Sequence, residues 1–132
     1  MATVLVVDDR RVNRDLVRTV LGYHGHATLE AGGGHEALTV LEHDRPDVVL
    51  VDLVMPDMNG YELARAIRSD PHTMAIPVVF YTANYLAAET STAATNEPVT
   101  RIVEKTGDLT ALVEAINDAV APPDIVEAFG AG

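Results

Sequence analysis

The stretch "DVVLVD", residues 47–52, decides the fold class of this chain. Its four central residues are all apolar and three of them are valine, which is typical of a β-strand buried on both faces. Such strands occur in parallel sheets that lie between two layers of helices. The next segment, "LVMPDMNG" at 53–60, contains a proline and an Asn-Gly pair and is predicted to be a loop. The stretch therefore predicts an inner strand of a parallel α/β sheet.

Apolar runs of the same kind recur on both sides of this strand and predict the rest of the sheet. They are "VLVV" at 4–7, "HATLE" at 26–30, "IPVVFYT" at 76–82 and "VTRIVEK" at 99–105. Segments with apolar residues about one helical turn apart separate them and predict helices. Five strands that alternate with five helices predict a doubly wound α/β three-layer sandwich, because parallel strands require crossover connections.

The predicted helices differ in how clearly they are marked. The first carries Val12, Leu16, Val17, Val20 and Leu21 and is expected to end at Gly22, and the second carries Ala37, Leu38 and Leu41 and stops before Pro46. The third carries Leu63, Ala66 and Ile67, and the fourth is a weakly patterned segment at 84–96. The fifth carries Leu109, Leu112, Val113, Ile116 and Val120, with Asp108 as its N-cap. The triplet "GGG" at 32–34 lacks the spacing of a dinucleotide-binding loop and is interpreted as a flexible turn. Tyr81 is expected to pack in the fourth strand rather than to bind a ligand.

Length and charge limit the function classes. The 132 residues suit one domain, predicted over 1–121, with 122–132 as a tail or linker after the Pro122-Pro123 pair. A net charge of −11 opposes a nucleic-acid partner. The absence of cysteine excludes disulfides and thiolate metal sites. The start, "MATVLVVDD", is neither a signal peptide nor a membrane span, so a cytoplasmic protein without membrane contact is expected.

Polar residues follow four of the predicted strands at their carboxyl ends. They are Asp8 and Asp9, Asp52, Thr82 and Lys105, which is the only lysine beside eight arginines. Any one of them alone could simply end a strand or cap a helix. Parallel sheets of this type bind ligands at the carboxyl ends of their strands, so the five residues together predict a site.

The residue types at this edge favour phosphoryl chemistry with a hard cation. Three neighbouring carboxylates repel one another unless a proton or a cation intervenes, and an all-oxygen donor set suits Mg²⁺, or Mn²⁺ in its place. The histidines lie away from the strand ends; His24 and His26 are expected to face solvent or cap a turn, which argues against zinc. In this interpretation Asp52 is the nucleophile for an aspartyl phosphate, and Asp8 and Asp9 hold the metal. Thr82 and the compact ammonium of Lys105 bind phosphoryl oxygens.

Four pieces of the chain together resemble the receiver (CheY-like) domain of bacterial two-component response regulators. They are "VLVVDD", "DVVLVDLVMPDMNGYE", "IPVVFYTA" and "IVEK", in the order and at the separations usual in that family, and the resemblance extends from Thr3 to about Val120. It implies a flavodoxin-like fold with strand order 2-1-3-4-5. It also implies phosphorylation of Asp52 by a sensor histidine kinase or a phosphotransfer protein, with no catalysis beyond the gain and loss of this phosphoryl group.

The same resemblance assigns finer roles to residues around Asp52. It implies that Mg²⁺ is held by Asp9, Asp52 and the backbone carbonyl of Val54, with Asp8 supporting through water. It implies that the small Ala83 leaves room for the phosphoryl group. An output domain, an effector or a second copy in a homodimer would read the signal on the face formed by the fourth helix, the fifth strand and the fifth helix.

Two positions depart from the family pattern. The proline usual after the lysine, which is joined by a cis bond, is replaced by Thr106. Because a cis bond before another residue costs about 2.5–4 kcal/mol, either a trans bond with a shifted loop or an exceptional cis bond is expected. The aromatic switch residue three positions before the lysine is Ile102. Together the two departures leave the predicted phosphorylation site complete but predict an atypical signalling face.

Three alternatives to a phosphorylation switch stay open at this point. The chain could be an atypical receiver that acts as an interaction module largely independent of phosphorylation, or the receiver fragment of a larger hybrid kinase or regulator. A dehalogenase-type phosphatase is disfavoured, because its Asp-x-Asp arrangement after the first strand is replaced by "VVDDRR".

Overall fold

The computed structural model of the chain describes residues 1–83, 101–105 and 109–120. Within them, five parallel strands form one sheet in the order β2-β1-β3-β4-β5, which confirms the predicted α/β architecture and strand order. The expected helix at 84–96, the Asp108 cap and the tail at 122–132 lie outside the described residues. No helix among the described residues is long and apolar enough to cross a membrane.

The strands lie close to the predicted positions. They are β1 (Thr3–Val7), β2 (Ala27–Ala31), β3 (Val48–Asp52), β4 (Val78–Thr82) and β5 (Arg101–Glu104). The central β3 is paired in register with β1 on one side, where Val7 faces Val51, and with β4 on the other, where Asp52 faces Tyr81. Its residues from Val48 to Val51 are all buried, as their apolar run predicts.

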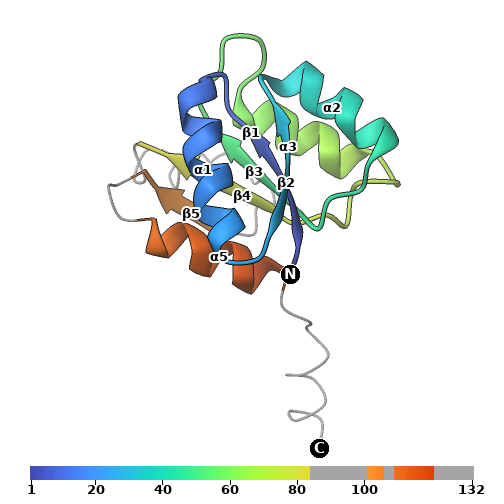
Figure 1. Cartoon of the computed structure of the whole chain (residues 1–132). Coiled ribbons are helices and arrows are strands. Elements are labelled where there is room, and N and C mark those ends of the chain that lie inside the picture. Colours follow the sequence, from blue (N-terminus) through green and yellow to red (C-terminus); the bar gives the residue numbers. More distant parts are fainter. Residues whose placement is uncertain (84–100, 106–108, 121–132) are drawn as a thin grey trace, which may run out of the picture.

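Helices cover both faces of the sheet, and each face has its own core (Figure 1). The helices are α1 (Arg11–Tyr23), α2 (Gly34–His43), α3 (Gly60–Ser69) and α5 (Thr110–Val120). Leu5, Val49 and Phe80 pack with residues of α2 and α3, whereas Val6, Leu50 and Tyr81 pack with residues of α1 and α5. The two cores follow from the alternation of side chains along each strand. Burial of one such Val, Leu or Phe contributes about 1.5–3 kcal/mol.

Helix α1 differs from its prediction in two respects. It ends at Tyr23 rather than at Gly22, and the turn into β2 is made by Gly25, whose positive φ of 80° suits glycine. Only Val17 and Leu21 of its apolar stripe are buried, while Val12 and Leu16 are 70% and 53% exposed. The spacing of the apolar residues predicted the helix correctly, but fewer of them are buried than the spacing indicated.

The glycine triplet is a packed junction rather than a flexible turn. Gly33 is the N-cap of α2 and Gly34 is its first residue. A Cβ on Gly33 would lie 2.8 Å from Asp57 Oδ1, and one on Gly34 would lie 2.7 Å from Met58 Sδ. A side chain at either position would have to displace Asp57 or Met58, because the loop after β3 lies directly against the start of α2.

His26 is buried, so the prediction that it faces solvent or caps a turn is wrong; His24 is exposed as predicted. The His26 Nδ1 atom accepts a hydrogen bond from the Ala2 backbone N–H (3.1 Å), and its Nε2 lies 2.9 Å from Asn117 Oδ1. Since Nδ1 is an acceptor, Nε2 carries the proton and donates to Asn117. One imidazole therefore joins the start of β1 to α5.

Replacement of His26 by leucine should lower the free energy of unfolding by about 1–3 kcal/mol, because it leaves the buried Ala2 N–H without an acceptor. Urea denaturation followed by circular dichroism measures the change. His24→Gln, at an exposed position nearby, should stay within about 0.5 kcal/mol of wild type. Equal stability of the His26 variant and the control would contradict the bridging role.

Candidate functional site

The carboxyl ends of β1, β3, β4 and β5 meet at one edge of the sheet and bring the predicted polar residues together. Asp8 and Asp9 follow β1, Asp52 and Thr82 are the last residues of β3 and β4, and Lys105 follows β5. The parallel pairing of these strands carries residues from distant parts of the chain to this edge.

Lys105 lies between two of the carboxylates. Its Nζ donates to Asp52 Oδ2 at 2.9 Å and to Asp8 Oδ2 at 3.5 Å. Burial alone would lower the pKa of the Lys105 ammonium, but hydrogen bonds and negative charge from Asp52 and Asp8 outweigh it, and the net pKa is raised above its usual value. The ammonium therefore stays charged at neutral pH and partly neutralises the acidic edge.

The three aspartates form a cluster with a donor set that fits a hard divalent cation. One carboxylate oxygen from each of Asp8, Asp9 and Asp52 lies within 4.8 Å of the others. Asp8 is buried, Asp52 is partly buried and Asp9 is exposed, so the cluster opens to solvent on the Asp9 side. An arrangement of oxygen ligands alone, with no histidine or cysteine among them, matches the preference of Mg²⁺ or Mn²⁺.

The loop after β3 holds the Asp52 carboxylate through a backbone hydrogen bond. Asp52 Oδ1 accepts a hydrogen bond from the Val54 backbone N–H at 3.2 Å. The loop closes where the Gly60 N–H donates to the Leu53 carbonyl at 3.0 Å, and a Cβ on Gly60 would lie 3.0 Å from the Asp52 carbonyl oxygen. A capping box between Asn59 and Glu62 then starts α3. The sequence "MNG" therefore brings α3 close against the end of β3.

Asp57 links the same loop to helix α2. Its carboxylate accepts hydrogen bonds from the backbone N–H groups of Gly34 (3.4 Å) and His35 (3.2 Å) and lies 3.0 Å from His35 Nδ1. The backbone and side-chain hydrogen bonds of His35 lower the pKa of Asp57 from 3.8 to about 2, although burial acts in the opposite direction. A residue 23 positions away in sequence thus caps the N-terminus of α2.

Tyr81 packs beneath the site as well as in the core, in agreement with its predicted packing role. Lys105 Nζ lies 5.5 Å from the centre of its ring, within the range of a cation–π contact. Burial raises the pKa of the Tyr81 phenol; the charge of Lys105 lowers it and that of Asp8 raises it, and the net pKa is raised. The Tyr81 ring therefore lies between the Lys105 ammonium and the core.

The remaining predicted residues lie at this edge or beside it. Thr82 is buried at the end of β4, and its carbonyl accepts the Lys105 backbone N–H at 2.6 Å. Ala83, directly after β4, is exposed. Ile102 of β5 is paired with Phe80 of β4. Its side chain packs against the core on the face that α2 and α3 cover. Thr106, and with it the form of the Lys105-Thr106 bond, lies outside the described residues.

The family model of the response regulator receiver domain matches residues 4–117. The chain belongs to the response regulator receiver domain family. It is therefore a phosphoacceptor module of two-component signalling, as the four motifs predicted. The phosphatase alternative loses its support.

Several known proteins resemble the chain over much of its length. Protein PilH of Pseudomonas aeruginosa is 39% identical over 82 residues, which are 62% of this chain and 68% of PilH. Sensor histidine kinase RcsC of Salmonella typhimurium is 44% identical over 86 residues, which are 65% of this chain but 9% of RcsC. Response regulator TrrA of Thermotoga maritima, solved in complex with Mg²⁺-BeF, is 28% identical with a TM-score of 0.79, covering 90% of this chain and 99% of TrrA.

Several residues that shape this receiver site carried no signal in the sequence. Arg14 donates to the Asp8 carbonyl from α1, and Asp57 reaches α2 from the loop after β3. Neither contact follows from spacing, because each joins elements whose relative placement is set only by the folded sheet. The Asn59 and Glu62 capping box does follow a recognisable pattern, in which an N-cap residue precedes a glutamate by three positions.

In this receiver, Asp57→Asn should destabilise the fold most at neutral pH, with an effect that fades in acid. A carboxyl whose folded pKa of about 2 lies below its ordinary 3.8 stabilises the folded state fully above the ordinary value, and loses that contribution as pH falls toward 2. Urea titrations of wild type and variant over this range measure the difference. Glu42→Gln, which removes one exposed negative charge from α2, serves as control. A gap between wild type and Asp57→Asn that widens in acid would contradict the assignment.

Proposed function

We propose that Asp52 is the phosphoacceptor of this receiver and that its phosphorylation depends on Asp8, Asp9, Thr82 and Lys105. The observation that carries the proposal is the 2.9 Å contact of Lys105 Nζ with Asp52 Oδ2, inside a cluster of three carboxylates. Asp52 belongs to that cluster and is the aspartate that Lys105 contacts most closely. Its position at the end of the buried β3 gives it a rigid base.

The transfer step requires one carboxylate oxygen of Asp52 to attack the phosphorus of a phosphohistidine. The new O–P bond forms as the P–N bond breaks, and the leaving imidazole nitrogen keeps the bonding electron pair and takes up a proton. Asp52 Oδ1 is held by the Val54 N–H and Oδ2 by Lys105, so the carboxylate is fixed before the donor arrives. This orientation removes part of the entropic cost of reaching an in-line geometry.

Positive charge and hydrogen-bond donors must then stabilise the transferred phosphoryl oxygens. Lys105 is the cation placed to do this, since its ammonium can follow an oxygen from the carboxylate to the bound phosphoryl group with little movement of its flexible stem. The Thr82 hydroxyl is proposed as the second donor, with the small Ala83 beside it leaving space. Asp9 and Asp52, the Val54 carbonyl and, less directly, Asp8 would hold Mg²⁺ or Mn²⁺. When bound, the ion neutralises negative charge on the carboxylates and on the phosphoryl group.

The partners follow from the same chemistry. A sensor histidine kinase or phosphotransfer protein would supply the phosphohistidine, and the cytoplasm, where ATP can charge such donors, is the proposed location. Residues 1–121 form the proposed receiver unit, with 122–132 as tail or linker. An output domain, an effector or a second copy would read phosphorylation through the face that contains β5 and α5. The RcsC and PilH matches are compatible with a receiver either within a hybrid kinase or in a shorter regulator.

Incubation with acetyl phosphate and Mg²⁺ should add one phosphoryl group to the wild-type chain, detected as a mass gain in intact-protein mass spectrometry. Asp52→Asn should show none, since the amide is a poor nucleophile of nearly the same shape. Asp57→Asn, on the same loop but pointing to α2, serves as the matched control and should still be modified. A wild type that stays unmodified, or a modified Asp52→Asn, would overturn the assignment.

Lys105→Arg should keep phosphorylation but weaken its effect on the rest of the domain. A planar guanidinium retains the charge but cannot occupy the position of the ammonium between Asp52 and the Tyr81 ring. Amide NMR spectra recorded with and without beryllofluoride and Mg²⁺ compare the induced shifts in β5. Lys105→Met, which loses the charge, sets the lower limit. Shifts as large in the arginine variant as in wild type would show that any cation suffices.

A further inference from the structure

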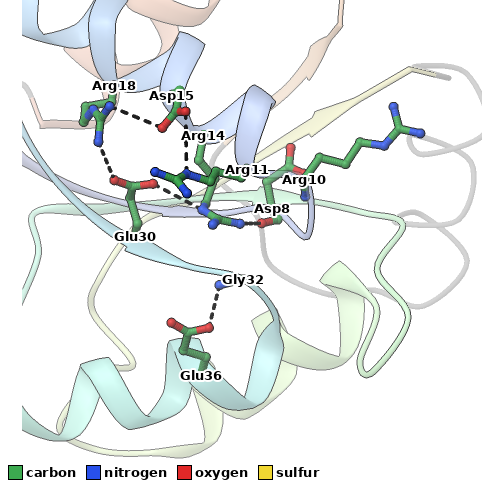
Figure 2. A network of polar contacts seen from close by, with 9 residues as sticks. All are labelled: Asp8, Arg10, Arg11, Arg14, Asp15, Arg18, Glu30, Gly32 and Glu36. Carbon is green, nitrogen blue, oxygen red and sulfur yellow. Dashed lines mark hydrogen bonds and ion pairs between the residues drawn. The ribbon is translucent and has the colours of Figure 1, made fainter.

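Two arginines of α1 connect this helix to one glutamate in the edge strand β2 (Figure 2). Arg14 and Arg18 both project from α1, and both pair with Glu30 in β2, at 3.2 Å from Nε and 3.1 Å from Nη1 respectively. Arg18 also pairs with Asp15 of its own helix at 3.2 Å. The two arginines thus share one partner but differ in their other contact.

Arg14 alone of the two reaches the site. Its Nη1 donates to the Asp8 backbone carbonyl at 2.7 Å while its Nε is held by Glu30, as Figure 2 shows. The Arg14 side chain is 17% exposed, against 52% for Arg18. Its guanidinium is therefore fixed at two of its donors, in a geometry that only a planar fork provides.

Arg14 contacts the stretch of backbone that carries Asp8 and Asp9, the two aspartates after β1. The Asp8 carbonyl and the Asp9 N–H belong to one planar peptide unit, so holding the carbonyl fixes the plane from which Asp9 projects. The Asp8 backbone N–H donates to the Ala31 carbonyl at 3.1 Å, and Asp8 Oδ1 accepts the Arg10 N–H at 2.8 Å. The Asp8 main chain is therefore held through its N–H by β2 and through its carbonyl by Arg14.

We propose that Arg14 is a positioning residue that sets the Asp8–Asp9 peptide plane and thereby the affinity of the acidic cluster for a divalent cation. The proposal rests on the proposed function of this edge as the Mg²⁺-dependent phosphorylation site. Arg14 does not touch the reacting atoms itself; it acts through the Asp8 carbonyl, and Glu30 holds Arg14 in place for that contact.

Charge alone makes the opposite prediction. Removal of an arginine near three carboxylates makes the site more negative and should tighten cation binding, whether the arginine is Arg14 or Arg18. A lysine at position 14 keeps the charge, but its three donors share one nitrogen, so it cannot reproduce the spacing of Nε and Nη1 with which Arg14 holds Glu30 and the Asp8 carbonyl. The lysine variant therefore separates positioning from charge.

The test measures Mg²⁺ binding by isothermal titration calorimetry, with no phosphoryl donor present, in the full chain and in Arg14→Lys, Arg14→Gln and Arg18→Gln. If Arg14 positions the Asp8–Asp9 peptide, the Kd for Mg²⁺ should rise about tenfold in Arg14→Lys. Loss of a residue that supports a metal ligand typically weakens metal binding by this much. The same role predicts a Kd no weaker than wild type in Arg18→Gln. Measurement at a temperature where circular dichroism shows each variant fully folded removes any effect of global stability. Wild-type affinity in Arg14→Lys would overturn the proposal.

Phosphorylation kinetics supply a second readout. In Arg14→Lys, the acetyl phosphate reaction should need about tenfold more Mg²⁺ for its half-maximal rate, but should reach a near wild-type rate at saturation, because Asp52 and Lys105 are untouched. A lower saturating rate with unchanged Mg²⁺ dependence would contradict a role in metal positioning. If the wild type takes up no phosphoryl group, the proposed function fails, while the calorimetric comparison still decides the role of Arg14.

Discussion

Repulsion among three carboxylates at one sheet edge is the constraint on which the site depends. Asp8, Asp9 and Asp52 lie with oxygens within 4.8 Å of one another, in surroundings that are buried on the Asp8 side. Like charges at such distances raise the free energy of the folded chain unless donors and cations surround them. The chain supplies the Lys105 ammonium and backbone N–H groups at Arg10 and Val54. The charge that remains suits a divalent cation.

The two sides of the site are held by different faces of the sheet. On one face, Arg14 of α1 holds the main chain at Asp8. On the other face, Asp57 joins the loop after β3 to the start of α2. Helix packing on each face therefore reaches the acidic edge through one polar side chain. Both layers of helices therefore support the edge, and a shift of either layer would alter it.

The sequence predicted the strands and the site much better than the contacts behind them. β3 was predictable because a continuous apolar run ended by Asp52 has few other interpretations, and parallel pairing then fixes where the strand ends lie. His26 was predicted wrongly because its partner Asn117 is 91 positions away, and a histidine pattern does not reveal a buried acceptor. Val12 and Leu16 fit the helical period of α1 but are exposed. Periodicity defines a stripe, whereas packing decides how much of that stripe is covered.

Tyr81 gives the site an optical property of its own. The chain has no tryptophan, so its near-ultraviolet signal comes mainly from four tyrosines. Tyr81 differs from the exposed Tyr23 in that its ring is buried and lies next to the ammonium of Lys105. Movement of that charge from Asp52 toward a phosphoryl oxygen, as proposed above, would change the electric field across the ring. The absorption and emission of this phenol would thus report the state of the acidic edge without an added label.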